Sequence, residues 1–207
     1  MVRIVAKARS VWIAAAVGLA IGAPLAWAQQ PQDDGLAARK RGETLMALKA
    51  SVSAPGAEAR HSRTRDGFVR HLSAPAGKRF PVASARGADA ASVARAFLDE
   101  NRALFVSDSP SVALEPIRTT SEGPDSFVRF RQTYAGVPVW GAQTVVQVSP
   151  GGVAYVASDL LRHTRALDEG LVPTAPTVTA DEAAQLAAAS MAEDHDPASL
   201  KADAPTL

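Results

Sequence analysis

The stretch from Ser126 to Asp159 constrains the fold of this chain most, because apolar and polar residues alternate along three successive extended segments. In the first segment the more apolar face holds Val128, Phe130, Gln132 and Tyr134, and the other face holds Arg129, Arg131 and Thr133. The second segment runs from Ala142 to Val148 and the third from Val153 to Ala157, with a Pro150-Gly151-Gly152 turn between them. A period of two residues with turn residues between the segments predicts an antiparallel meander.

The residues between the first two segments read Val137-Pro138-Val139-Trp140-Gly141. Proline has no backbone N–H to donate to a sheet ladder. We therefore expect this part to be an extended apolar link outside the central ladder.

One helix is predicted upstream, from Asp89 to Phe105. The carboxylate of Asp89 can accept from the free amides of the first helical turn. Apolar residues recur at helical spacing and are interrupted at Asn101: Ala90, Val93, Ala94, Phe97, Leu104 and Phe105. Val112–Thr119 is predicted to be a strand and Thr120–Asp125 a polar loop. The fold class is therefore α+β, with an antiparallel sheet packed against one main helix.

The N-terminal half carries weaker signals. Arg60–Val82 is predicted to be a hairpin whose turn is Pro75-Ala76-Gly77. Residues 29–59 are expected to be flexible or loosely helical, with a flexible start at Gln29–Gly35 and a helix over Leu36–Ala50.

The first 28 residues have the layout of a secretory signal peptide. A basic start precedes an apolar core from Val11 to Leu25, and Ala26-Trp27-Ala28 is a small-x-small cleavage site. The rival interpretation is an uncleaved membrane anchor, which needs about 20 predominantly apolar residues. The apolar span here is short and contains Pro24, so we expect cleavage between Ala28 and Gln29, no stable membrane anchor, and a secreted or periplasmic protein.

Charge and cysteine content exclude several classes of function. Three of the 22 basic residues precede Gln29, which leaves 19 basic and 21 acidic residues in the remainder. This balance gives no basic footprint for nucleic acid. The chain has no cysteine, so it has neither a disulfide nor a thiolate nucleophile.

The run Arg131–Ala142, with its Tyr-Ala-Gly-Val-Pro-Val-Trp-Gly core, resembles the fungalysin/thermolysin propeptide (FTP) domain of secreted zinc metalloprotease precursors. The resemblance spans roughly Ser84–Asp159, including the helix with its Leu104-Phe105 end. It implies an FTP-like propeptide domain over 60–166 and a Pro-rich linker over 167–178. It also implies that residues 179–207, which begin with a Thr179–Glu182 capping box, are the first helix and frayed end of an incomplete, PepSY-like second lobe.

The residues themselves offer no catalytic chemistry. A metalloprotease of the resembled kind needs His-Glu-x-x-His, and the four histidines (His61, His71, His163 and His195) form no such pair. The chain also lacks a Gly-x-Ser-x-Gly elbow and a phosphate-binding glycine loop. We therefore expect a non-catalytic chain without a cofactor or a metal site.

Binding is the function that remains. The resemblance implies a propeptide region that assists folding of a zinc metalloprotease catalytic domain and inhibits it. The candidate partner contacts are on the less apolar strand face and in the link: Arg129, Arg131, Thr133, Val137 and Trp140.

Three alternatives stay open. The 207 residues hold no protease domain, so the chain is either a partial precursor or a form that acts in trans. The third alternative is a stand-alone exported structural or ligand-binding domain that shares only the meander, which an enclosed apolar pocket with convergent polar groups would favour.

Overall fold

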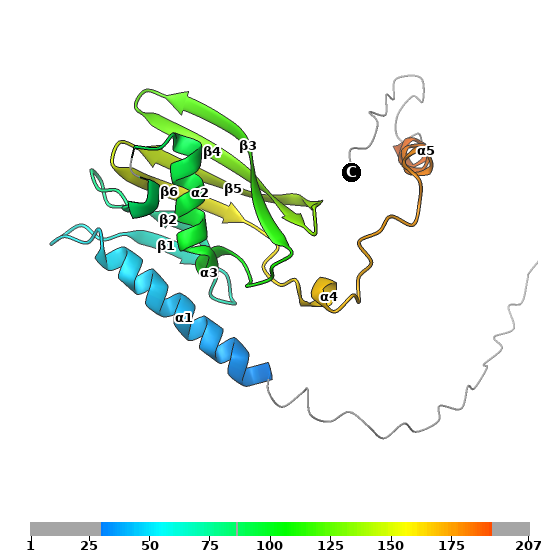
Figure 1. Cartoon of the computed structure of the whole chain (residues 1–207), viewed down its shortest axis with the longest axis horizontal. Helices are drawn as coiled ribbons and strands as arrows, with labels where there is room; N and C mark the ends of the chain where they lie inside the picture. Colours follow the sequence, from blue (N-terminus) through cyan, green and yellow to red (C-terminus); the bar gives the residue numbers. More distant parts are fainter. Residues whose placement is uncertain (1–29, 86, 192–207) are drawn as a thin grey trace, which may run out of the picture.

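The computed structural model describes residues 30–85 and 87–191, and the predicted signal peptide, its cleavage site at Ala28 and Gln29, and the predicted frayed end lie outside that range. A six-stranded antiparallel sheet forms the body, with strands in the order β1-β2-β6-β5-β4-β3. Helix α2 (Ala90–Glu100) lies across one face of this sheet (Figure 1). The predicted α+β class is confirmed.

The predicted meander is present and has four strands rather than three. They are β3 (Val112–Glu122), β4 (Asp125–Tyr134), β5 (Val137–Ser149) and β6 (Gly152–Asp159). Val128, Val146 and Val156 are aligned across β4, β5 and β6, and all three are fully buried. The alternation in the sequence therefore marks the face that packs against the core.

The predicted polar loop at Thr120–Asp125 is wrong. Strand β3 continues to Glu122 and β4 starts at Asp125, so only a tight turn at Gly123-Pro124 remains, in which Gly123 has a φ of 56°. Because β3 is an edge strand, its end is held by backbone pairing with β4 and needs no apolar side chains.

The link around Pro138 is also part of the sheet, contrary to prediction. Pro138 lies within β5 and is opposite Thr133 of β4. Strand β6 pairs with β5 only from Gln143 onward, so β5 has a neighbour on one side only at its start. Proline is tolerated there because the missing N–H leaves no ladder bond unmade on the free side.

The predicted hairpin exists, but with a different turn. It joins β1 (Arg60–Arg63) to β2 (Val69–Ser73), so the turn lies before β2 rather than at Pro75-Ala76-Gly77. The Pro75–Gly77 turn follows β2 instead. It leads to a short 3-10 helix η1 (Ala83–Ala85) and brings Phe80 into a bridge with Val153 of β6.

The predicted helix from Asp89 is confirmed at its start and divided near its end. Oδ1 of Asp89 accepts from the backbone N–H of Ser92 at 3.0 Å, as an N-cap should. The helix breaks at Asn101, whose side-chain amide donates to the carbonyl of Phe97 at 2.9 Å, and α3 (Arg102–Phe105) follows. An asparagine that bonds the backbone locally competes with the regular helix.

The core lies between α2, α3 and the sheet. Its largest fully buried side chains include Phe80, Phe97, Phe105, Phe130, Leu72, Leu98 and Leu104. Helix α1 (Gln30–Ala50) begins earlier than predicted, so the expected flexible start is wrong from Gln30 onward. Figure 1 shows α1 beside α3, and Leu45 of α1 is buried in the same core. Leu45, Val52 and Ala59 thus tie this part of the chain to the core.

The chain after β6 becomes progressively more exposed. A short helix α4 (Arg165–Asp168) is followed by residues 169–179, all of which are exposed. Helix α5 (Ala180–Met191) stands apart from the sheet in Figure 1. The predicted capping box is present, since Glu182 accepts from the N–H of Thr179 at 2.9 Å and the Thr179 hydroxyl accepts from the N–H of Glu182 at 3.2 Å.

Candidate partner interface

The two faces of the sheet differ in what covers them. Helix α2 packs on the face that holds Val128 and Phe130. On the opposite face, which we call the open face, the side chains are exposed or half-buried, among them Phe127, Arg129, Arg131, Val145 and Tyr155. This open face, which carries both charged and apolar side chains, is the broad surface that the fold leaves available.

Two of the predicted contact residues lie on the open face. The guanidinium of Arg131 donates from Nε to Glu115 at 3.1 Å and forms an ion pair with it at 3.0 Å. The guanidinium of Arg129 donates to the side-chain oxygen of Gln143 at 2.7 Å. Both arginines are exposed, and their role as partner contacts stays a prediction.

Thr133 is buried, although the alternation predicted an exposed side chain on the face of Arg129 and Arg131. Its side chain is 2% exposed, and Gln132, Thr133 and Tyr134 are buried in succession. The register shifts here, since Arg131 is opposite Gln143 whereas Thr133 is opposite Pro138. The extra residues of this bulge belong to β5 and lie beside Thr133. Thr133 therefore offers almost no side-chain surface to a partner.

The other two predicted contacts lie at the tip formed by β4 and β5. The tip turns at Ala135 and Gly136, whose φ values are 48° and 82°. Trp140 follows in the bulged part of β5, next to Gly141 with a φ of 73°. Val137 is 41% exposed and Trp140 is fully exposed, at 101%. Trp140 therefore contributes no packing to the described body.

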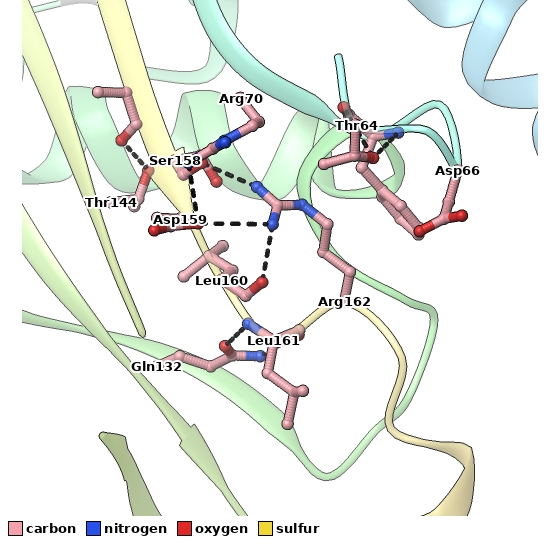
Figure 2. A network of polar contacts seen from close by, with 12 residues as sticks. Thr64, Asp66, Arg70, Gln132, Thr144, Ser158, Asp159, Leu160, Leu161 and Arg162 are labelled. Carbon is pink, nitrogen blue, oxygen red and sulfur yellow. Dashed lines mark hydrogen bonds and ion pairs between the residues drawn. The ribbon is translucent and has the colours of Figure 1, made fainter. Parts of the chain in front are cut away.

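A polar network anchors the strand that carries this tip, and Figure 2 shows it at close range. Gln132 is fully buried, and its amide donates to the carbonyl of Leu161 at 2.8 Å and accepts from the N–H of Leu161 at 2.7 Å. This pair of bonds satisfies a buried polar side chain and fixes the segment after β6 against β4.

Arg162 holds the same segment from the other side (Figure 2). Its guanidinium donates to the carbonyls of Leu160 and Ser158 at 2.9 and 2.8 Å. Burial lowers the pKa of Arg162, and Asp159 at 3.8 Å opposes that effect. Arg162 therefore acts as a structural clamp on the end of β6.

Asp168 of α4 ties the end of β4 to the segment that follows β6. Its carboxylate accepts from the hydroxyls of Ser109, Thr164 and Tyr134 at 2.7, 2.8 and 2.9 Å. The bonds from Ser109 and Thr164, and then that from Tyr134, hold the pKa of Asp168 below its ordinary value. These contacts continue past Ala166, where the predicted propeptide domain ends.

Sequence reasoning did not single out Gln132, Arg162 or Asp168 as anchors. The one available signal was Gln132, a polar residue at an apolar position of a strand. Most partners of these three are distant in the chain or are backbone groups, which no spacing rule identifies.

A second polar surface lies between α1, the β1–β2 turn and the segment before α4. The carboxylate of Asp66 lies 3.0 Å from Nε2 of His163, within hydrogen-bond distance. The guanidinium of Arg41 lies 4.1 Å from the ring centre of Phe68. Within residues 30–85 and 87–191, no three His, Asp or Glu side chains gather closely enough to hold a metal ion. These contacts join α1 to the body and form no evident reactive site.

The comparison with family models decides the kind of domain. Residues 117–158 match the Fungalysin/Thermolysin Propeptide Motif. The chain carries an FTP propeptide motif. No curated protein matches the chain. The earlier resemblance is therefore confirmed over the region from the middle of β3 to the end of β6.

The FTP motif indicates a non-catalytic propeptide of the kind found in secreted thermolysin-like metalloproteases, where it pairs with the protease domain. The matched residues include the open-face arginines of β4 and the tip with Trp140. They do not reach the linker or α5, so the second, PepSY-like lobe stays a prediction. None of the described helices combines the length and apolar composition needed to cross a membrane.

Proposed function

We propose that this chain is the propeptide region of an exported thermolysin-like metalloprotease, and that it assists folding of the protease domain and inhibits it. It docks through the tip of β4 and β5 and through the adjoining open face. Export follows from the predicted signal peptide over residues 1–28. In this proposal the FTP-like domain spans residues 60–166, the linker spans 167–178, and the start of the second lobe spans 179–207, as predicted from the sequence.

The fully exposed Trp140 is the observation that carries the proposal. A tryptophan in water at the end of a rigid sheet leaves a large apolar side chain without a packing partner, whereas tryptophan is enriched among the residues that dominate binding energy at interfaces. Val137, on the same tip, adds a second exposed apolar side chain.

The surroundings of Trp140 support a docking role as well. Its strand pairs with β4, and β4 is anchored by the Gln132–Leu161 and Tyr134–Asp168 hydrogen bonds. A tip held in this way presents Trp140 on a rigid scaffold, which reduces the entropy lost on binding. The open face beside it supplies exposed arginines that can form the polar rim of an interface.

Titration of the processed chain, Gln29–Leu207, into a thermolysin-like protease tests the proposal, with residual cleavage of a peptide substrate as the readout. We expect saturable inhibition at micromolar concentration or below. Trp140→Ala should weaken inhibition by roughly 30-fold or more, the loss typical of an interface hot spot. A folded wild-type chain that does not inhibit would overturn inhibition in trans.

Leu171→Ala is the matched control, because Leu171 is also a large exposed apolar residue, at 72%, but lies outside the propeptide motif. It should leave inhibition unchanged. Equal losses in the two variants would show that the tip has no special role. Refolding yield of the denatured protease domain with and without the chain tests the folding-assistant role separately.

A further inference from the structure

Two arginines of the open face lie directly opposite each other. Arg118 of β3 is the cross-strand partner of Arg129 of β4. Like charges placed directly opposite in an antiparallel pair destabilise the sheet. Folding stability alone therefore does not account for this pairing.

Neither guanidinium of this pair is neutralised within residues 30–85 and 87–191. The ion pairs of that part of the chain do not include Arg118 or Arg129. Among the described residues, the guanidinium of Arg129 donates to the neutral side-chain amide of Gln143. Arg131, two residues further along β4, is in contrast paired with Glu115 of β3. The same two strands thus satisfy one arginine and leave two adjacent ones without a carboxylate.

A hollow of about 230 Å³ lies between the two arginines. Its lining combines two positive charges, a hydroxyl and two apolar side chains: Arg118, Arg129, Thr120, Phe127 and Val145. Guanidinium groups bind carboxylates through paired, charge-assisted hydrogen bonds. The apolar part of the lining, Phe127 and Val145, can pack against an aliphatic or aromatic residue next to that carboxylate. A free inorganic anion would make no such apolar contact.

We propose that the Arg118–Arg129 pair is a docking site for an acidic side chain, flanked by an apolar one, on the protease domain. The inference rests on the proposed function, because it names the chemistry by which the open face recognises that partner. Binding of the carboxylate relieves the repulsion between the two arginines. Complementary charge at such a site contributes to specificity and to the rate of association.

The decisive variant is Arg118→Glu. The new carboxylate is placed opposite Arg129, so it replaces a repulsive cross-strand pair with an attractive one. We expect the urea midpoint to stay the same or rise, while the concentration needed for half-inhibition of a thermolysin-like protease rises at least tenfold. A variant that is at least as stable and yet binds less well identifies a residue kept for binding.

Arg65→Glu is the matched control, since it makes the same charge change at an exposed residue of the β1–β2 turn, at the opposite edge of the sheet. It should alter inhibition less than twofold. Arg118→Gln removes the charge without adding one and should weaken inhibition in the same direction, so it keeps the test valid if Arg118→Glu does not fold.

The outcomes separate this inference from the proposed function. If the wild type does not inhibit, the inhibitory part of the proposed function fails and this site falls with it. If the wild type inhibits and both Arg118 variants inhibit equally well, only the docking site is overturned. A loss in Arg65→Glu as large as that in Arg118→Glu would also overturn it, because it would indicate a general effect of net charge.

Discussion

The alternating side chains of the ten-residue strand β4 form two faces that serve opposite purposes. Val128 and Phe130 point into the core and are fully buried, whereas Arg129 and Arg131 point from the same strand to the open face. The buried face is specified by packing against α2 and tolerates little change in volume. The open face makes few contacts that stability requires, so its charges are free to serve recognition.

The largest expected effect comes from comparing the stability cost of one substitution, phenylalanine to alanine, on the buried face and on the open face of β4. Phe130→Ala should lower the free energy of unfolding by about 3–5 kcal/mol, because it leaves a cavity in the core. Phe127→Ala, on the open face of the same strand and only half-buried, should cost less than about 1.5 kcal/mol. Urea unfolding of both variants gives the two values, and similar costs would contradict the division into faces.

The next effect concerns two glutamines. Gln132→Ala leaves the N–H and carbonyl of Leu161 without their partner and should cost about 1–3 kcal/mol. Gln143→Ala, on the open face, should change stability by less than about 0.5 kcal/mol. Thermal unfolding followed by circular dichroism measures both. A neutral Gln132→Ala would show that the segment after β6 does not need this anchor.

A pH titration tests the connection from β4 to α4. The pKa of Asp168 is lower in the folded chain than its ordinary value of 3.8, so its contribution to stability is present above that pH and is lost as the pH falls through the folded value. Between pH 5 and pH 2, the urea midpoint of the wild type should therefore fall more steeply than that of Asp168→Asn.

Other groups set the background of that titration. Asp89, Asp125 and Glu182 also have lowered pKa values, so both proteins should lose stability in acid. The informative quantity is the difference in slope between them. Parallel curves would mean that the hydroxyl cluster around Asp168 does not favour its ionised form.

The smallest effect is expected for the ion pair on the open face. Glu115→Gln removes the partner of Arg131 and should cost about 0–1 kcal/mol, since the side chains of both residues are nearly half exposed to solvent. The cost should shrink further at high salt. Chemical denaturation at two salt concentrations measures it, and a loss as large as that of Gln132→Ala would show that this face is structural after all.

Short-range patterns in the sequence predicted much of the fold. The alternation in β4, the N-cap at Asp89 and the capping box at Thr179 each depend on residues a few positions apart. The sequence also identified Trp140 as a candidate contact. These features could be read without the structure because the physical chemistry that produces them is local.

Features that depend on pairing distant segments could not be read in this way. Thr133 is buried because the register of β4 against β5 shifts beside it, and no alternation rule anticipates that bulge. Arg118 becomes the neighbour of Arg129 only through the register of β3 against β4. That register depends on a second irregularity, between Pro116 and Arg118, which places Arg118 rather than Ile117 opposite Arg129.

The sequence by itself thus determined the α+β class, the meander and its propeptide motif, because alternation, caps and turn residues act over a few positions. Only the tertiary structure decided which residues share a surface. Register, bulges and side-chain anchors such as Gln132–Leu161 arise from contacts between strands and segments far apart in the chain, and those contacts form only when the whole sheet assembles.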